Sequence, residues 1–309
     1  MNILKLSLSV SISYFLLVSC GSDSAKSASS PIKIKTIEQV KEHLFVLDYI
    51  LHDGALEIPS GDAFGIVGNR RPGEKRTIEC DQGSVDLKQT QIDKSFEDML
   101  EYHKCTLNDI TYNGTAKRLF PLRKYMTGDL DASTIWKEEY SNFTTKFTDK
   151  ESEVNLIQTN VLSRLTNFSV VTTTDGTYKL DKKKGSLTFS NFASVGPLGV
   201  KSVRNNAYNG KITIDTHCEN GSDKGTYIVE TVKELHYKAR HAMSSRASGI
   251  IKLNSVTFTY DDPYVHVQVG DENKTFTIDT LLDFMQTSVE EHCLSPFYTP
   301  HDAYEFRGG

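Results

Sequence analysis

The feature that most constrains this chain is the alternation of apolar and polar residues that begins at Arg76 and recurs through the rest of the sequence. Lys211–Thr216 is a clear case, because Ile212 and Ile214 alternate with polar residues. Such alternation is typical of a strand with one buried and one solvent-facing side. We therefore predict a mainly β fold of antiparallel sheets, arranged as an elongated sheet or as a sandwich, with one N-terminal and one C-terminal helix.

Turn residues divide the alternating pattern into strand candidates. Asp81–Gly83 separates two short alternating segments, Thr77–Cys80 and Ser84–Leu87, which predicts strand, turn, strand. Asp175-Gly176 lies between β-forming residues and predicts a hairpin with a type I′ turn. Phe96–Lys104 fits either a helix or a strand, and we favour a strand. The other strand candidates are 110–116, 134–147, 186–192, 211–216, 227–232, 249–260, 265–269 and 275–278.

Two helices are expected outside this pattern. Thr36 and Gln39 have the spacing of a capping box, and apolar residues then recur at helical spacing as far as Leu51. Such a stripe suits packing on the body better than a coiled coil with a partner. Near the other end of the chain, Asp279 is the predicted N-cap of a helix that leads to Cys293.

The N-terminus carries an export signal. One lysine precedes a short apolar run that is diluted by serines, and the run is too short to span a membrane comfortably. It ends in Leu17-Val18-Ser19-Cys20. This segment resembles the lipobox of bacterial lipoproteins, and an ordinary secreted protein cut near Cys20 is the alternative.

The resemblance implies cleavage before Cys20, a diacylglycerol on its sulfur and usually an acyl chain on its new amino group. Two or more chains anchor a protein stably, whereas one does so only marginally. In such lipoproteins an Asp after the cysteine retains the protein at the inner membrane. Gly21 and Ser22 follow Cys20 instead, which implies that the protein lies at the outer membrane. The lipid on Cys20 would attach it to that membrane.

Four cysteines remain when Cys20 carries lipid. An even number in an oxidising compartment predicts two disulfides, and four cysteines allow three pairings. We expect Cys80 with Cys105 and Cys218 with Cys293, because each pair brackets one local unit.

The expected organisation follows from these features. We predict a signal peptide over 1–19, a flexible tether over 20–30, an N-terminal helix over 31–56 and β-rich units over 57–205 and 206–309, the second ending in the C-terminal helix. The motifs Cys80-Asp-Gln-Gly-Ser and Cys218-Glu-Asn-Gly-Ser raise the question of a duplication. The mature part also loosely resembles β-rich lipoproteins with no known activity.

The candidate metal ligands in the sequence are histidine, cysteine and acidic residues. The pairs His217-Cys218 and His292-Cys293 contain zinc-type ligands without the usual short spacing, so disulfides are favoured. Asp261, Asp262, Asp271 and Glu272 could bind calcium, but turn-like surroundings favour solvated side chains. No nucleophile elbow, zinc-protease motif or phosphate-binding loop occurs in the sequence. We therefore predict no catalytic residue, cofactor or metal.

The formal net charge is −5 and no basic stripe occurs, which argues against nucleic acid as a partner. The leading prediction is a non-enzymatic, lipid-anchored envelope protein that binds an envelope or extracellular protein or polysaccharide. A lipid-handling or envelope-assembly protein of the periplasm and a hydrolase with a non-obvious site are the alternatives.

Overall fold

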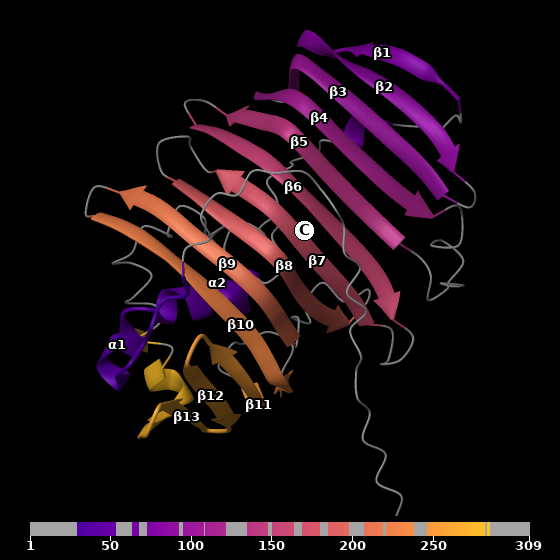
Figure 1. Ribbon diagram of the computed structural model, residues 1–309. Coiled ribbons are helices and arrows are strands. Elements are labelled where there is room, and N and C mark those ends of the chain that lie inside the picture. The colour runs from indigo at the N-terminus through magenta and orange to yellow at the C-terminus, as the bar shows by residue number, and fades with distance from the viewer. Residues whose placement is uncertain are drawn as a thin grey trace, which may run out of the picture.

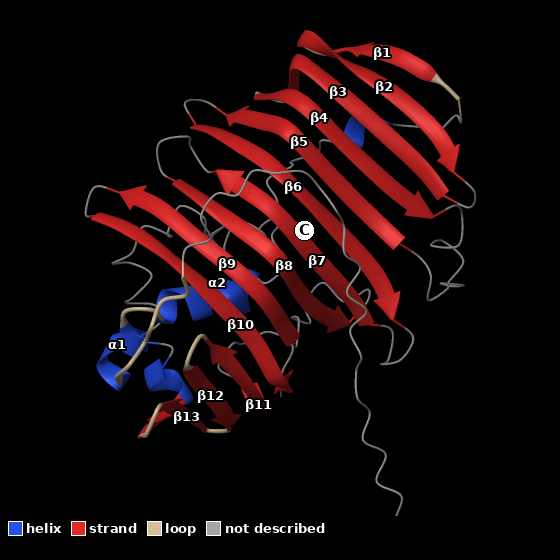
Figure 2. Ribbon diagram, viewed as in Figure 1, coloured by secondary structure: helices blue, strands red, loops and turns tan. Residues whose placement is uncertain are grey.

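The computed structural model describes residues 30–53, 64–67, 73–92, 95–107, 109–121, 135–147, 150–163, 169–179, 185–197, 207–218, 221–237, 246–281 and 283–284. They form one antiparallel sheet of fourteen strands, in which each strand pairs with its sequence neighbours (Figures 1 and 2). The mainly β prediction is confirmed. The sheet is elongated, and the sandwich alternative is wrong, because all the described strands belong to a single sheet.

The first seven strands form one half of the sheet. They are β1 (Lys75–Glu79), β2 (Gln82–Ile92), β3 (Ser95–Leu107), β4 (Ile110–Pro121), β5 (Ile135–Phe147), β6 (Lys150–Ser163) and β7 (Ser169–Lys179). Apolar side chains on one face of these strands form a cluster rich in aromatic rings, with Tyr102, Tyr112 and Phe143 in mutual contact. The short 3-10 helix η1 (Gly65–Val67) adds Val67 to this cluster.

The remaining strands form the other half. They are β8 (Gly185–Pro197), β9 (Ala207–Cys218), β10 (Gly221–Tyr237), β11 (Arg246–Leu253), β12 (Val256–Asp261), β13 (Tyr264–Val269) and β14 (Glu272–Thr277). Their apolar face shares a second buried cluster with two helices, α1 (Ile37–Lys41) and α2 (Leu44–Asp53). Figure 1 shows both helices at this end of the sheet, far from β1.

The single predicted N-terminal helix is therefore only partly correct. Thr36 is the N-cap of α1, and its hydroxyl accepts from the Gln39 N–H at 3.4 Å. The helix then breaks at Glu42 and His43 before α2 begins. The four residues of 44–47 are all buried, so α2 is apolar around its described circumference rather than along one stripe.

At the other end of the chain, helical residues begin at Ile278, directly after β14. The cap is Thr277 rather than Asp279, because the Thr277 hydroxyl accepts from the Thr280 N–H at 3.2 Å. Asp279 lies inside the first turn, and the continuation of this predicted helix beyond Phe284 lies outside the described residues.

Two strand predictions also need correction. Asp175-Gly176 is not a hairpin turn, since β7 runs straight through it and pairs with β6 and β8. Gly176 has a φ of +127° at a register shift between β7 and β8, and a Cβ there would lie 2.3 Å from the Asn155 carbonyl oxygen. The glycine thus allows a close backbone approach at a bulge. The predicted strand 249–260 is the hairpin of β11 and β12, with Asn254 at positive φ in its turn.

Asp175-Gly176 is one of three Asn/Asp-Gly dipeptides that act in the same way inside strands. In each, the side-chain oxygen accepts from a backbone N–H of a neighbouring strand, and the glycine faces another backbone closely. Register shifts accompany them. A row of bulges lets a wide sheet bend across its strands. The oxygen and its donor are Asn113 with Lys104, Asp175 with Asn191, and Asn209 with Thr231.

The chain enters the sheet beside β10. Pro31 forms a parallel bridge with Thr226, and the Ile32 N–H donates to the Thr226 carbonyl at 3.1 Å. The β11–β12 turn holds the same segment, since Asn254 Nδ2 donates to the Ile32 carbonyl at 2.9 Å. Ser255 Oγ donates to the Ile34 carbonyl at 2.7 Å. The first described residues are thus fixed to the body at one point of the sheet.

Candidate functional site

The candidate site is a row of polar side chains on the face of β2–β7 that otherwise carries the core. Cross-strand register places six residues side by side, one on each strand. Each has the same side-chain parity as the buried apolar residues of its strand, such as Leu87 on β2 and Leu100 on β3. We call these residues the polar row: Gln89, Asp98, Arg118, Glu138, Gln158 and Thr174.

Ion pairing and hydrogen bonds link members of the polar row. Arg118 Nη2 and Nε lie 2.7 and 2.9 Å from Glu138 Oε1, and the Tyr140 hydroxyl donates to Glu138 Oε2 at 3.0 Å. Gln89 Nε2 donates to Asp98 Oδ1 at 2.9 Å. The Arg118 and Glu138 side chains are 26% and 13% exposed to solvent, so the middle of the row is partly accessible. Gln89 and Asp98, by contrast, are buried.

Phe64, just before η1, packs against the middle of the polar row. The guanidinium carbon of Arg118 is 4.0 Å from the centre of the Phe64 ring, a cation–π arrangement. Phe64 also meets Tyr140 edge-on at 6.3 Å. On the β1 side, the Arg76 guanidinium donates to the Val67 carbonyl. Residues 64–67 are therefore held across the sheet by one arginine at each side.

A second row of side chains runs parallel to the polar row, two residues further along each strand from the apolar core. Phe96 and Phe120 are register partners with ring centres 6.0 Å apart, and both are half-buried. On β6 and β7, Thr172 donates to Asn160 at 2.7 Å. We call these four residues the flanking row. Exposed parts of aromatic rings thus adjoin carboxylate, guanidinium and amide groups.

Neither row has a local signal in the sequence, because the members lie on six strands and become neighbours only through register. One clue was present. Gln89 follows Val85 and Leu87 at the same parity, and Asp98 precedes Leu100 and Tyr102 at the same parity. A polar residue at a core-facing position indicates that it has a hydrogen-bonding partner in the folded protein, since burial without a partner is costly.

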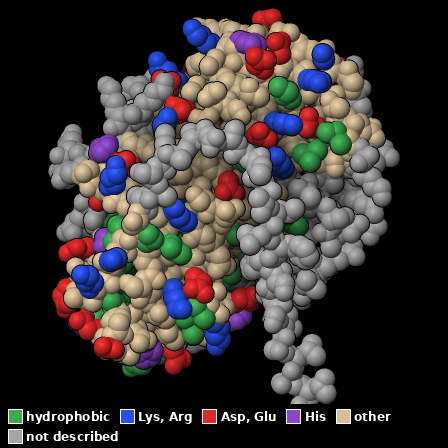
Figure 3. Space-filling view, viewed as in Figure 1, with side chains coloured by type: hydrophobic (Ala, Val, Ile, Leu, Met, Phe, Trp, Pro, Cys, Tyr) green, Lys and Arg blue, Asp and Glu red, His purple; other side chains and the backbone are tan. Residues whose placement is uncertain are grey.

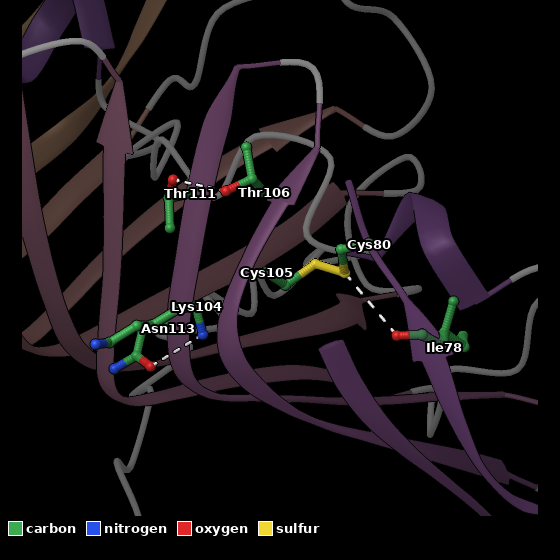
Figure 4. The surroundings of a disulfide bond; sticks show 7 residues. All are labelled: Ile78, Cys80, Lys104, Cys105, Thr106, Thr111 and Asn113. Carbon is green, nitrogen blue, oxygen red and sulfur yellow. Dashed lines mark hydrogen bonds between the residues drawn. A yellow bond between two sulfur atoms is a disulfide. The ribbon is translucent and has the colours of Figure 1, made fainter. Parts of the chain in front are cut away.

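The predicted disulfide between Cys80 and Cys105 is confirmed (Figure 4). It joins the end of β1 to β3 across the β1–β2 turn, where the Asp81 N–H also donates to the Thr106 carbonyl. Beside it, the Lys104 N–H donates to Asn113 Oδ1 at 3.3 Å. Closing this loop fixes the edge hairpin to the sheet. Cys20, Cys293 and the side chain of Cys218 lie outside the described residues, so the second pairing stays a prediction.

The other candidate ligands are not brought together. Asp261 and Asp262 lie at one end of β13 and Asp271 at the other, roughly 20 Å away for a six-residue strand. Glu272 instead accepts from the Ile37 N–H at the start of α1. His217 is exposed and lies 3.5 Å from Asp215. In the described part of the chain, no group of three or more His, Cys, Asp or Glu side chains could hold a metal ion.

The opposite face of the sheet is well solvated. Figure 3 shows basic and acidic side chains interspersed over the face in view. Cross-strand ion pairs include Lys224 with Asp215 at 2.9 Å. Hydrogen bonds from Thr77 and then His103 lower the pKa of the exposed Asp86 carboxyl. On the core face, burial raises the pKa of Tyr178 to about 12, and that of Tyr227 further still.

Searches of protein-family models, of curated proteins and of solved structures each found no match for this chain. No helix among the described residues is long and apolar enough to cross a membrane.

Proposed function

We propose that this protein is a non-enzymatic, lipid-anchored protein of the cell envelope that binds a hydroxyl-rich polymer, a polysaccharide, along the polar row. The observation that carries the proposal is the polar row itself, with half-buried phenylalanines beside it. Carboxylate, guanidinium and amide groups together supply both donors and acceptors to hydroxyl groups. Aromatic faces attract the C–H groups of a sugar ring.

The dimensions support an extended ligand. Six strands at about 4.8 Å spacing give a row of roughly 24 Å. One strand spacing is close to the length of one sugar unit in an extended glycan, so successive strands can meet successive units. The accessible stretch is centred on Arg118 and Glu138, which the flanking row adjoins.

Binding is favoured over hydrolysis because the two acids are already engaged. Both oxygens of Glu138 accept hydrogen bonds, from Arg118 and from Tyr140, and Asp98 accepts from Gln89. Asp98 and Glu138 also lie two strands apart. Groups that hold each other in this way are suited to orienting a ligand rather than to exchanging protons with it.

The anchor part of the proposal rests on the lipobox at Cys20 and its lipid, with the outer membrane as the location. A tether over 20–30 would reach at most about 35 Å when fully extended. Because Pro31 is fixed beside β10, the body would stay close to the lipid surface. A Cys20→Ser variant is expected to lose acylation, seen by mass spectrometry, and to leave the membrane fraction. Normal acylation of that variant would contradict the anchor.

Glycan binding can be tested in two assays with the full-length, detergent-solubilised protein. The first is co-sedimentation with peptidoglycan sacculi. The second is native electrophoresis in gels that contain the polysaccharide part of lipopolysaccharide, in which binding slows the protein. We expect one of these probes to bind, and Phe120→Ala to weaken that binding about tenfold, since stacking contributes roughly 1–2 kcal/mol. Phe147→Ala is the matched control, because Phe147 is an exposed phenylalanine at the other end of β5. Equal losses in the two variants, or no retention by either probe, would refute the proposal.

A further inference from the structure

The edge strand β1 carries charged side chains that form no ion pair with the described residues of its own sheet. Lys75 on β1 stands directly opposite Lys88 on β2, and both side chains are exposed. Like charges directly opposite each other destabilise a strand pair. Within the described residues neither lysine forms an ion pair, and neither does Glu79 at the other end of the strand. In that part of the chain, two cations and one anion thus lack an opposite charge.

The backbone of β1 is also open on one side. The strand pairs with β2 alone, and Figure 1 shows it at the end of the sheet with no described element beyond it. The Gln89 N–H donates to the Glu74 carbonyl, and the Cys80 N–H donates to the Gly83 carbonyl. Hydrogen bonding alternates along an antiparallel pair, so even-numbered residues of β1 face β2. The backbone groups of Lys75, Thr77 and Glu79 therefore point away from the sheet.

The sequence of β1, Lys-Arg-Thr-Ile-Glu, matches itself when it is read antiparallel about Thr77. In that register Lys75 of one copy lies opposite Glu79 of the other, twice by symmetry. The three residues with outward backbone groups pair with one another, as a continuous ladder requires. The second copy's Glu79 would also lie beside the Lys75–Lys88 pair and relieve its repulsion.

We infer that β1 is a homodimer interface, at which two copies of this chain join their sheets edge to edge about a two-fold axis at Thr77. Such an interface is isologous and closes, so it gives dimers and not fibres. Short, charged edge strands normally discourage edge pairing. Here the charges select one partner and one register, because any other register sets like charges opposite each other or leaves them unpaired. The Cys80–Cys105 disulfide and the Asp81 hydrogen bond hold this hairpin in place.

The dimer joins the sheet ends that carry the polar rows, but it uses none of the row's side chains. Its test is therefore independent of glycan binding, since dimers can form whether or not a polysaccharide binds. If both hold, two polar rows in one particle would bind a long polymer with avidity.

Cysteine crosslinking tests the register. In a hydrogen-bonded antiparallel pair, opposite Cα atoms lie about 5.5 Å apart, which suits a disulfide. The full-length chain with Thr77→Cys is expected to form covalent dimers under mild oxidation. Thr275→Cys is the matched control, because Thr275 is an exposed threonine on the opposite edge strand and is also hydrogen-bonded to a neighbouring strand. Crosslinking no greater at position 77 than at 275 would overturn the interface.

Charge exchange tests the pairing. Lys75→Glu and Glu79→Lys each turn two attractive pairs into repulsive ones, so each alone is expected to weaken dimerisation about tenfold in sedimentation velocity. Mixing the two variants should restore a dimer, because the heterodimer regains both ion pairs. The double variant K75E/E79K should likewise dimerise. A wild-type chain that sediments as a monomer at every soluble concentration, or a mixture that stays monomeric, would refute the inference.

Discussion

The guanidinium of Arg118 on β4 and the carboxylate of Glu138 on β5 form a partly buried ion pair at 2.7 Å in the middle of the polar row. Removing one partner leaves the other charge in a poorly solvated position. We expect Arg118→Met to lower the free energy of unfolding by about 2–4 kcal/mol, measured by urea denaturation. Lys224→Met is the control for an exposed pair and is expected to cost under about 1 kcal/mol.

Replacing both partners of this pair separates stability from binding. The double variant R118M/E138L removes both charges, and we expect it to regain most of the stability lost in Arg118→Met, to within about 1 kcal/mol of wild type. Sedimentation with the polysaccharide probe should still show weaker binding than wild type. A double variant that binds normally would remove Arg118 and Glu138 from the candidate site.

Gly114 on β4 faces the Asn142 backbone of β5 at a bulge. A Cβ at Gly114 would lie 2.1 Å from the Asn142 carbonyl oxygen, and its φ of +96° disfavours any other residue. We expect Gly114→Ala to destabilise the fold by more than about 2 kcal/mol in urea denaturation. Gly270→Ala is the control, because Gly270 has positive φ but no atom within 4 Å of the added Cβ, and it should cost about 1 kcal/mol. Similar losses at the two positions would show that backbone approach is not the cause.

The Cys80–Cys105 disulfide closes a loop with a sequence separation of 25. In the chain-entropy account, a loop of this length stabilises the fold by about 3.5 kcal/mol. The variant C80A/C105A should therefore show a clearly lower denaturation midpoint in urea than wild type. Because the bond fixes the edge hairpin, hydrogen exchange in β1 should rise more than in β12. An unchanged midpoint would contradict this prediction.

Burial of Tyr178 predicts alkaline sensitivity. Burial disfavours the phenolate and raises the pKa of Tyr178 from 10.0 to about 12, while a hydrogen bond with Ser152 opposes the shift. Between these values the unfolded chain has lost the proton that the folded chain keeps. Its contribution to stability is therefore complete below pH 10 and declines as the pH rises toward 12. Urea denaturation at pH 9 and pH 11 should show a smaller loss in Tyr178→Phe than in wild type.

The alternation of residues was enough to predict the kind of strand and most strand positions, since a two-residue period has one structural meaning. The Cys80–Cys105 disulfide was predicted on a different ground, because these two cysteines bracket one local unit. The prediction from sequence failed where one dipeptide can serve two structural roles. Asp-Gly is the preferred hairpin dipeptide, but Asp175-Gly176 serves a bulge, because the neighbouring backbone needs the space that a Cβ would fill.

The sequence patterns were sufficient to predict a β-rich body and a helix N-cap at Thr36, and they favoured Cys80–Cys105 among three possible pairings. The arrangement of the strands in space was needed to show that they form one sheet, that Arg118 meets Glu138, and that β1 lies at an open edge. The reason is physical. Local pattern sets which face of a strand is buried, whereas register between strands, adjusted here by bulges, sets which side chains of distant segments become neighbours.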